Sequence, residues 1–222
     1  MSIAVAIDGP AGAGKSTISK SAAKELGFIY VDTGALYRTV GLAASRKNVE
    51  PVQGEEVNNL LDSIKVELTF NDKGEQVVLL NGEDVSAFIR TPEASMMASK
   101  ISAIPEVRAY LLDLQRNMAT TNNVIMDGRD IGTVVLPNAE VKIFLTATPE
   151  ARATRRYKEL VEKGIDVKYD DILQDVITRD YNDSHREIAP LKQADDAVLA
   201  DTTEIDLQGS IDLIVSIIKE RM

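Results

Sequence analysis

The stretch Gly9-Pro10-Ala11-Gly12-Ala13-Gly14-Lys15-Ser16 decides the fold. It matches the pattern G-x-x-x-x-G-K-[ST], follows the apolar run Ile3 to Ile7, and precedes a helical pattern in which Ile18, Ala22 and Leu26 share a face. Glycines allow successive backbone N–H groups to point at phosphate oxygens, and the following helix adds the positive end of its dipole. The alternative is a glycine-rich turn without a ligand, but the strand and helix on either side favour a phosphate-binding loop.

This loop predicts ATP or a similar triphosphate as a ligand. We expect Lys15 to reach the β- and γ-phosphates, and the Ser16 hydroxyl to bind Mg²⁺, with Thr17 adding a neighbouring hydroxyl. Such loops serve kinases, GTPases and motor ATPases alike, so the acceptor has to be inferred elsewhere. The guanine-specific tetrapeptide Asn-Lys-x-Asp is absent, which argues against a GTPase switch. The expected ATP-binding residues of the loop are Gly9, Pro10, Ala11, Gly12, Ala13, Gly14, Lys15, Ser16 and Thr17.

Composition excludes several classes of function. The 222 residues carry a formal net charge of −10, which argues against binding long nucleic acids. No apolar run approaches the roughly 18 residues that a membrane span needs, and the N-terminus lacks the features of a signal or transit peptide, so we expect a cytoplasmic protein. With no cysteine and a single histidine, His185, any metal must be held by oxygen ligands. Because the surface is acidic and no anchor is present, we expect a monomer.

Short apolar runs alternate with helical patterns, and this alternation predicts right-handed βαβ units. The predicted fold class is α/β, a P-loop NTPase-type doubly wound parallel five-stranded sheet with helices on both faces, an inserted monophosphate-binding region and a helical lid. The predicted strands are residues 3–7, 29–31, 124–126, 141–145 and 197–200.

One segment departs from this alternation. Ile64, Val66, Leu68 and Phe70 alternate with polar residues, and a turn then leads to a second strand at 77–80. This pattern predicts a small antiparallel β-meander at about 64–86, inside an insertion. The predicted division is a core of residues 1–33, 111–148 and 166–222, an insertion of 34–110, and a lid of 149–165.

Two polar clusters follow predicted strands and should meet at the carboxyl edge of the sheet, where open α/β folds bind ligands. They are Asp32-Thr33-Gly34-Ala35-Leu36-Tyr37-Arg38 and Asp127-Gly128-Arg129-Asp130-Ile131-Gly132-Thr133. Taken alone, each also fits an exposed loop held by salt bridges. Together, beside a phosphate-binding loop, they favour a second site.

Arginines also recur at helical spacing. Thr148-Pro149 predicts a helix start, after which Arg152, Arg155 and Arg156 share a face, and Arg179, Asp183 and Arg186 follow in a helix that ends before Pro190. The alternative for each group is a solvated face with glutamate partners, such as Glu150 and Glu159.

Such arginines suit a monophosphate acceptor. A hydroxyl acceptor calls for a carboxylate base, whereas a monophosphate already offers an anionic oxygen. The reaction then needs positive charge on both sides of the transferring phosphoryl group, and a closing lid that excludes water. The expected catalytic residues are Lys15, Arg129 and Arg186.

On these motifs the whole chain resembles the bacterial cytidylate kinases, of the nucleoside monophosphate kinase family. Further matching runs are Gly82-Glu83-Asp84-Val85, Ile89-Arg90-Thr91 and Ala189-Pro190-Leu191, and the Asp-Gly-Arg-Asp-x-Gly-Thr run and the meander resemble features of this family alone. The resemblance implies phosphate transfer from ATP with Mg²⁺ to CMP and dCMP. It assigns the acceptor phosphate to Thr33, Arg38, Arg129 and Arg186, the ribose to Arg179 and Asp183, cytosine to Ser99, Arg108 and Asp130, and lid contacts with ATP to Arg152, Arg155 and Arg156.

The cytosine assignment also fits the chemistry of the base. Asp130 can accept a hydrogen bond from the exocyclic amino group, and Arg108 can donate to N3 and O2. Uracil presents a carbonyl oxygen to the carboxylate instead, so we expect UMP to be a poorer acceptor by about 1 to 3 kcal/mol. The alternative for Arg108 is a surface position on a helix starting at Pro105, and Ser99 alone has no interpretation.

Two rival functions remain open from the sequence. One is another small-molecule P-loop kinase of the adenylate or shikimate type, against which the meander and the missing carboxylate base argue. The other is a nucleotide-binding regulatory module that hydrolyses ATP slowly and needs no second phosphate pocket.

Overall fold

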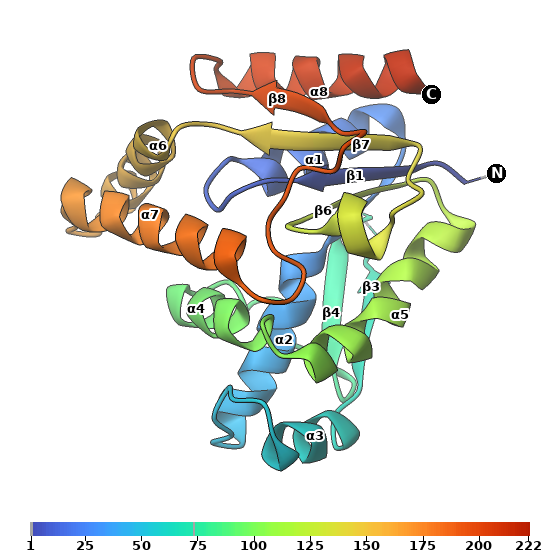
Figure 1. The fold of residues 1–222 in the computed structure, drawn as a ribbon, viewed down its shortest axis with the longest axis vertical. Helices are drawn as coiled ribbons and strands as arrows, with labels where there is room; N and C mark the ends of the chain where they lie inside the picture. The colour runs from blue at the N-terminus through green and yellow to red at the C-terminus, as the bar shows by residue number, and fades with distance from the viewer. Residues whose placement is uncertain (1, 73) are drawn as a thin grey trace. The chain divides into compact units, whose positions relative to one another are not determined.

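A computed structural model describes residues 2–72 and 74–222 of the chain. Its main sheet has five strands in the order β2-β6-β1-β7-β8, and Figure 1 labels β6, β1, β7 and β8 among them. The pairs β1–β7 and β7–β8 are parallel, with Ile7 opposite Ile143 and Ile143 opposite Val198. All five predicted strands are confirmed, and their bounds are β1 Ala4–Asp8, β2 Ile29–Asp32, β6 Val124–Gly128, β7 Val141–Thr146 and β8 Val198–Asp201.

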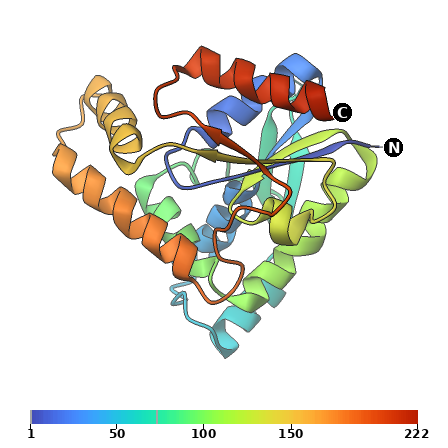
Figure 2. The same ribbon diagram turned by 45° about the horizontal axis from the view of Figure 1, so that its top comes forward.

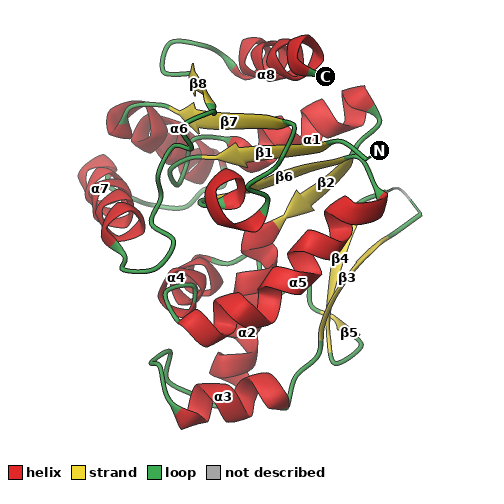
Figure 3. Ribbon diagram, turned by 45° about the vertical axis from the view of Figure 1, so that its right-hand side comes forward, coloured by secondary structure: helices red, strands yellow, loops and turns green. Residues whose placement is uncertain are grey.

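The predicted meander is also present, as a second sheet of three antiparallel strands (Figure 3). The strands are β3 (Val66–Phe70), β4 (Gln76–Leu80) and β5 (Glu83–Asp84). Val66 lies opposite Leu80, and Phe70 opposite Gln76. The side-chain alternation of period two and the turn residues together specify this register.

Capping residues are found at both kinds of helix end. Gly27 ends α1 in a left-handed conformation at φ 71°, and the Thr148 side chain accepts a hydrogen bond from the Ala151 N–H at the start of α6. The helices are α1 Lys15–Leu26, α2 Thr33–Arg46, α3 Glu55–Asp62, α4 Pro92–Ile101, α5 Pro105–Thr121, the π-helical turn η1 Ile131–Val135, α6 Pro149–Glu162, α7 Tyr169–His185 and α8 Leu207–Arg221.

One helical expectation is wrong by a residue. Arg186 was predicted to share a helix with Arg179 and Asp183, but α7 ends at His185 and Arg186 has extended backbone, with φ −64° and ψ 143°. Its guanidinium Nε donates to the carbonyl of Ala189, 2.6 Å away, and this contact needs the chain to turn away from the helix axis. Arg186 is therefore placed by a loop.

The chain forms two compact units. One consists of Ser2 and residues 29–124, and its core is built around large buried side chains of α2, α4 and α5, among them Leu36, Ile101 and Leu111. The other consists of residues 3–28 and 125–222. Within that second unit α1 packs against α8, and α6 packs against α7 (Figure 2). The division into core, insertion and lid stays a prediction.

In the part of the chain that the structure describes, every helix is too short or too polar to cross a membrane. The longest, α5 and α7, have 17 residues each.

The phosphate-binding loop lies against the backbone of β7 at Gly9. A Cβ atom built on Gly9, whose φ is +152°, would lie 1.9 Å from the carbonyl oxygen of Leu145. Real atoms do not approach so closely, and the backbone carbonyl of a residue paired within the sheet has little freedom to move. Only glycine fits at this position without displacing the loop or the strand.

We therefore expect Gly9→Ala to lower the free energy of unfolding by more than about 3 kcal/mol, measured by urea denaturation. The matched control is Gly27→Ala, at φ +71° with no atom within 4 Å of the added Cβ. It should cost only the torsional strain of about 1 kcal/mol. Equal losses in the two variants would contradict the close packing of the loop against β7.

Candidate active site

The phosphate-binding loop curls around the side chain of Lys15. The ammonium group donates to the carbonyl oxygens of Gly9 and Pro10, at 2.7 Å each, and Lys15 is only 6% exposed. Gly14 caps the N-terminus of α1 without a side-chain hydrogen bond to the helix. Gly14 has no side chain that could cap the first turn of α1, as suits a helix whose N-terminus binds an anion.

Burial changes the acidity of the two ionisable groups beside this loop. Desolvation, followed by the nearby charge of Arg129, lowers the pKa of Lys15 to about 7. Desolvation raises the pKa of Asp8 to about 6, against the effect of its hydrogen bonds from Gly132 and Ile131. Both groups lose hydration that a bound ligand with its own charges can replace, which is a property of many active sites.

Asp8 connects the loop to the second polar cluster. It ends β1, and its two carboxylate oxygens accept hydrogen bonds from the backbone N–H groups of Ile131 (2.7 Å) and Gly132 (2.8 Å). Those N–H groups open the π-helical turn that follows Asp130. Asp8 therefore fixes the backbone next to Arg129 and Asp130.

Two arginines of this cluster form ion pairs with buried carboxylates. The Arg129 Nε lies 2.7 Å from an oxygen of Asp183, and Arg186 Nη2 lies 3.3 Å from an oxygen of Asp130. Burial, followed by the charge of Arg129, lowers the pKa of Arg179. The structure thus brings together five of the residues predicted for the acceptor, all within the unit that carries the phosphate-binding loop.

The three arginines of α6 have different surroundings. Arg152 is 2% exposed, and it donates to the carbonyl of Ala11 at 2.8 Å and pairs with Asp180. Arg155 donates to the backbone carbonyl of Thr202. Arg156 is exposed and pairs with Glu159 at 2.9 Å. Among the three, Arg152 is the one that contacts the phosphate-binding loop.

The remaining predicted acceptor residues belong to the unit of residues 29–124. Thr33 is buried at the first position of α2, and Arg38 Nη2 pairs with Asp32 at 2.7 Å. Arg108 is 9% exposed, donates to the carbonyl of Ser102 at 3.3 Å, and lies over the ring of Tyr37 at 5.7 Å. The alternative of an exposed surface position for Arg108 is therefore wrong. Ser99 is partly buried on α4.

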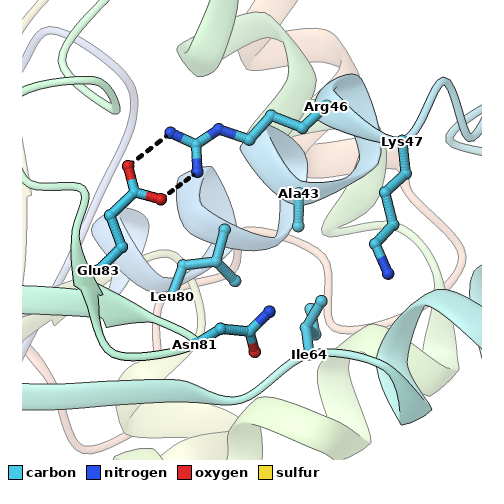
Figure 4. A pocket seen from close by; sticks show the side chains of 7 residues that line it. All are labelled: Ala43, Arg46, Lys47, Ile64, Leu80, Asn81 and Glu83. Atoms are coloured by element: carbon cyan, nitrogen blue, oxygen red, sulfur yellow. Dashed lines mark hydrogen bonds and ion pairs between the residues drawn. The ribbon is translucent and has the colours of Figure 1, made fainter.

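A cavity of about 190 Å³ in this unit lies between α2 and the meander. Figure 4 shows the paired Arg46 and Glu83 at its rim and the apolar side chains of Ile64 and Leu80 below. None of the predicted site residues lines it, so it is separate from the candidate site.

Comparison with known proteins identifies the family. The family model for cytidylate kinase matches residues 5–220. The chain belongs to the cytidylate kinase family. A cytidylate kinase of Caldicellulosiruptor bescii is 50% identical over 99% of this chain and 99% of its own, and one of Caldicellulosiruptor saccharolyticus is 52% identical over 93% and 91%.

A solved structure shares the fold of this cytidylate kinase family member. An uncharacterized protein from Eubacterium ventriosum superimposes with a TM-score of 0.54 over 99% of both chains, at 12% sequence identity. At that identity the match concerns the arrangement of strands and helices alone.

Two carboxylates that contact predicted site residues or their neighbours have no role in the sequence predictions for this family member. Asp8 is one of them, although an acidic residue that ends a strand directly before a phosphate-binding loop is a recognisable signal in the sequence. Asp180 is the other, and it pairs with Arg152. The sequence does not single it out, because α7 contains other acidic residues on its exposed side.

The residues beside the loop fit a magnesium ion held partly by phosphates. The Ser16 hydroxyl donates to an oxygen of Asp127 at 2.9 Å, so two hard oxygen donors lie side by side. No group of three or more histidine, cysteine, aspartate or glutamate residues among residues 2–72 and 74–222 could hold a metal by itself. Phosphate oxygens and waters would have to complete the shell.

The buried Lys15 predicts a pH-dependent stability. Its folded pKa of about 7 lies below the ordinary value of 10.5, so the unfolded chain binds more protons between these two pH values. The free energy of unfolding therefore rises with pH across that window, and the Lys15→Met variant lacks this gain. Relative to the variant, the parent should become more stable by at least about 1 kcal/mol between pH 7 and pH 10, measured by urea denaturation.

The control is Lys24→Met, at an exposed position of the same helix, which should keep the parent's pH profile. If Lys15→Met and the parent changed in parallel with pH, the ammonium group would not be desolvated.

Proposed function

We propose that this protein is a cytidylate kinase, a phosphotransferase that moves the γ-phosphate of ATP to the phosphate of CMP and releases CDP and ADP. The observation that carries the proposal is the family match over residues 5–220, with relatives about 50% identical along nearly the whole chain. The loop around Lys15 and the arginines paired with carboxylates are the chemistry that such a transfer requires.

On the ATP side, the loop amides and Lys15 are proposed to bind the phosphates. The ammonium group now donates to two loop carbonyls, and it can exchange these for the oxygens of a triphosphate without leaving the loop. When bound, Mg²⁺ would neutralise phosphate charge, with Ser16 and Asp127 as its protein donors. Arg152, on α6, stabilises the loop by donating a hydrogen bond to the carbonyl of Ala11.

On the acceptor side, Arg129 and Arg186 are proposed to bind the CMP phosphate and to stabilise the charge that spreads over the transferring group. Their partners Asp183 and Asp130 restrain the two guanidinium groups through these ion pairs before the substrate arrives. Such preorganisation lowers the cost of ordering long side chains on binding. The acceptor phosphate is its own nucleophile, so no side chain is needed as a base.

Thr33 and Arg38 are proposed as further ligands of the CMP phosphate, Arg179 and Asp183 as ligands of the ribose, and Ser99, Arg108 and Asp130 as readers of cytosine. The proposal also includes dCMP as a second acceptor, UMP as a poorer one, a lid at 149–165 that carries the ATP-contacting arginines Arg152, Arg155 and Arg156, and a cytoplasmic monomer. The burial of Arg108 and Asp130 supports base reading, because buried polar groups discriminate strongly against a mismatched partner.

A coupled assay tests the function directly. Purified protein with ATP and Mg²⁺ is offered CMP, dCMP, UMP, AMP and shikimate in turn, and we expect the highest kcat/KM with the cytidine nucleotides. Equilibrium binding of CMP without ATP is measured in parallel. Failure to phosphorylate any pyrimidine monophosphate would refute the proposal, and a preference for AMP or shikimate would favour the rival kinase classes.

Replacing Asp130 by Asn should reduce the ratio of kcat/KM for CMP over UMP by at least about 5-fold. The carboxylate accepts from the cytosine amino group, whereas an amide can turn its N–H₂ toward the uracil carbonyl. The measurement is the ratio of the two kcat/KM values, which cancels general losses in activity. Asp195→Asn, at an exposed position, is the control. An unchanged ratio in the Asp130 variant would remove this residue from the base-reading set.

A further inference from the structure

Asp32 uses its backbone and its side chain to organise the start of α2. It ends β2 and caps α2, where one carboxylate oxygen accepts from the Ala35 N–H at 2.9 Å and the other from Arg38 Nη2 at 2.7 Å. A Cβ on Gly34 would lie 2.9 Å from Arg38 Nη1 and 3.1 Å from Asp32 Oδ1, so the guanidinium packs directly over this glycine. The direction of Arg38 therefore depends on where Asp32 lies.

Gln76, at the start of β4, holds the backbone of Asp32. The Asp32 N–H donates to Gln76 Oε1 at 2.8 Å, and Gln76 Nε2 donates to the Asp32 carbonyl at 3.2 Å. The strand β2 is the edge of the five-stranded sheet, and within the described residues no further strand of this sheet lies beside its outer edge. One side-chain amide satisfies both groups, as a neighbouring strand would.

Glutamine is the side chain whose chemistry fits this position. It offers one acceptor and one donor at the right separation, whereas glutamate would place a carboxylate oxygen against the Asp32 carbonyl, and methionine would bond to neither group. Both partners belong to the unit of residues 29–124, in which β4 also contacts α2 (Figure 3). The meander is therefore hydrogen-bonded, through this one side-chain amide, to Asp32, the residue that directly precedes Thr33 and caps the helix that carries Arg38.

We propose that Gln76 is a positioning residue, through which the β-meander fixes Asp32 and thereby sets the direction of Arg38 and the first turn of α2 for the acceptor phosphate. The inference rests on the proposed function in taking Thr33 and Arg38 as ligands of CMP. It gives the inserted meander a role in substrate binding beyond that of covering α2.

The test is Gln76→Met in the full-length protein, with two measurements. Hydrogen exchange of the backbone amides at 32–38 should speed up by about 10-fold, since two hydrogen bonds to Asp32 are lost. The KM for CMP should rise on the order of 5- to 20-fold, while the KM for ATP stays within about 2-fold of the parent. Gln76→Glu should reproduce the loss in part.

Two further variants make the result specific. Thr69→Val, exposed on β3 of the same meander, should leave both measurements unchanged. In an Arg38→Met background, Gln76→Met should raise the KM for CMP by a smaller factor than in the parent, because the part of its effect that passes through Arg38 is already lost.

Unchanged exchange at 32–38 in Gln76→Met would overturn the inference, and so would equal rises in KM for CMP and ATP, or an undiminished effect in the Arg38→Met background. A parent protein that does not use CMP would refute the proposed function instead, while the exchange measurement would still decide whether Gln76 holds Asp32.

Discussion

The rest of the site depends on one constraint, a lysine ammonium group buried inside a loop of backbone. Lys15 is 6% exposed and is held by the carbonyls of Gly9 and Pro10. Removing a charge from water is costly, so the loop has to supply hydrogen bonds from a curled backbone. That curl places Gly9 against the carbonyl of Leu145, where no side chain fits. The negative charge of a bound polyphosphate would offset the desolvation cost of the ammonium group, which is why this site favours an anion.

Carboxylates organise the surrounding residues. Asp8 fixes the turn after Asp130, while Asp183 and Asp180 hold Arg129 and Arg152. The net charge of −10 is thus compatible with a polyanionic ligand, because part of the acidic excess serves to orient arginines. Arginine paired in this way presents a fixed fork of donors to a phosphate, at a smaller entropic cost than a free side chain.

The meander illustrates how a segment distant in the sequence can hold the start of a helix. Its alternating side chains pack on α2, and its first residue in β4, Gln76, pairs with the edge of β2. An edge strand has to satisfy its outer backbone groups in some way, and here a side chain does so at the residue that caps the next helix. Asp32 therefore takes part both in the hydrogen bonding at the sheet edge and in the capping of α2.

Sequence by itself determined the phosphate-binding loop, all five strands of the main sheet, the meander and the helix starts at Thr148 and Pro105, because these follow from local patterns of apolar, glycine and capping residues. Only the tertiary structure decided the partners of the charged groups. Asp8 and Gly132 are 124 residues apart, and Asp32 and Gln76 are 44 apart, so no local pattern reports their contact. No local pattern reports the contact of Arg152 with Ala11 either, because it depends on how α6 packs. The position of Arg186 likewise depends on the loop that follows α7, where its side chain donates to the carbonyl of Ala189.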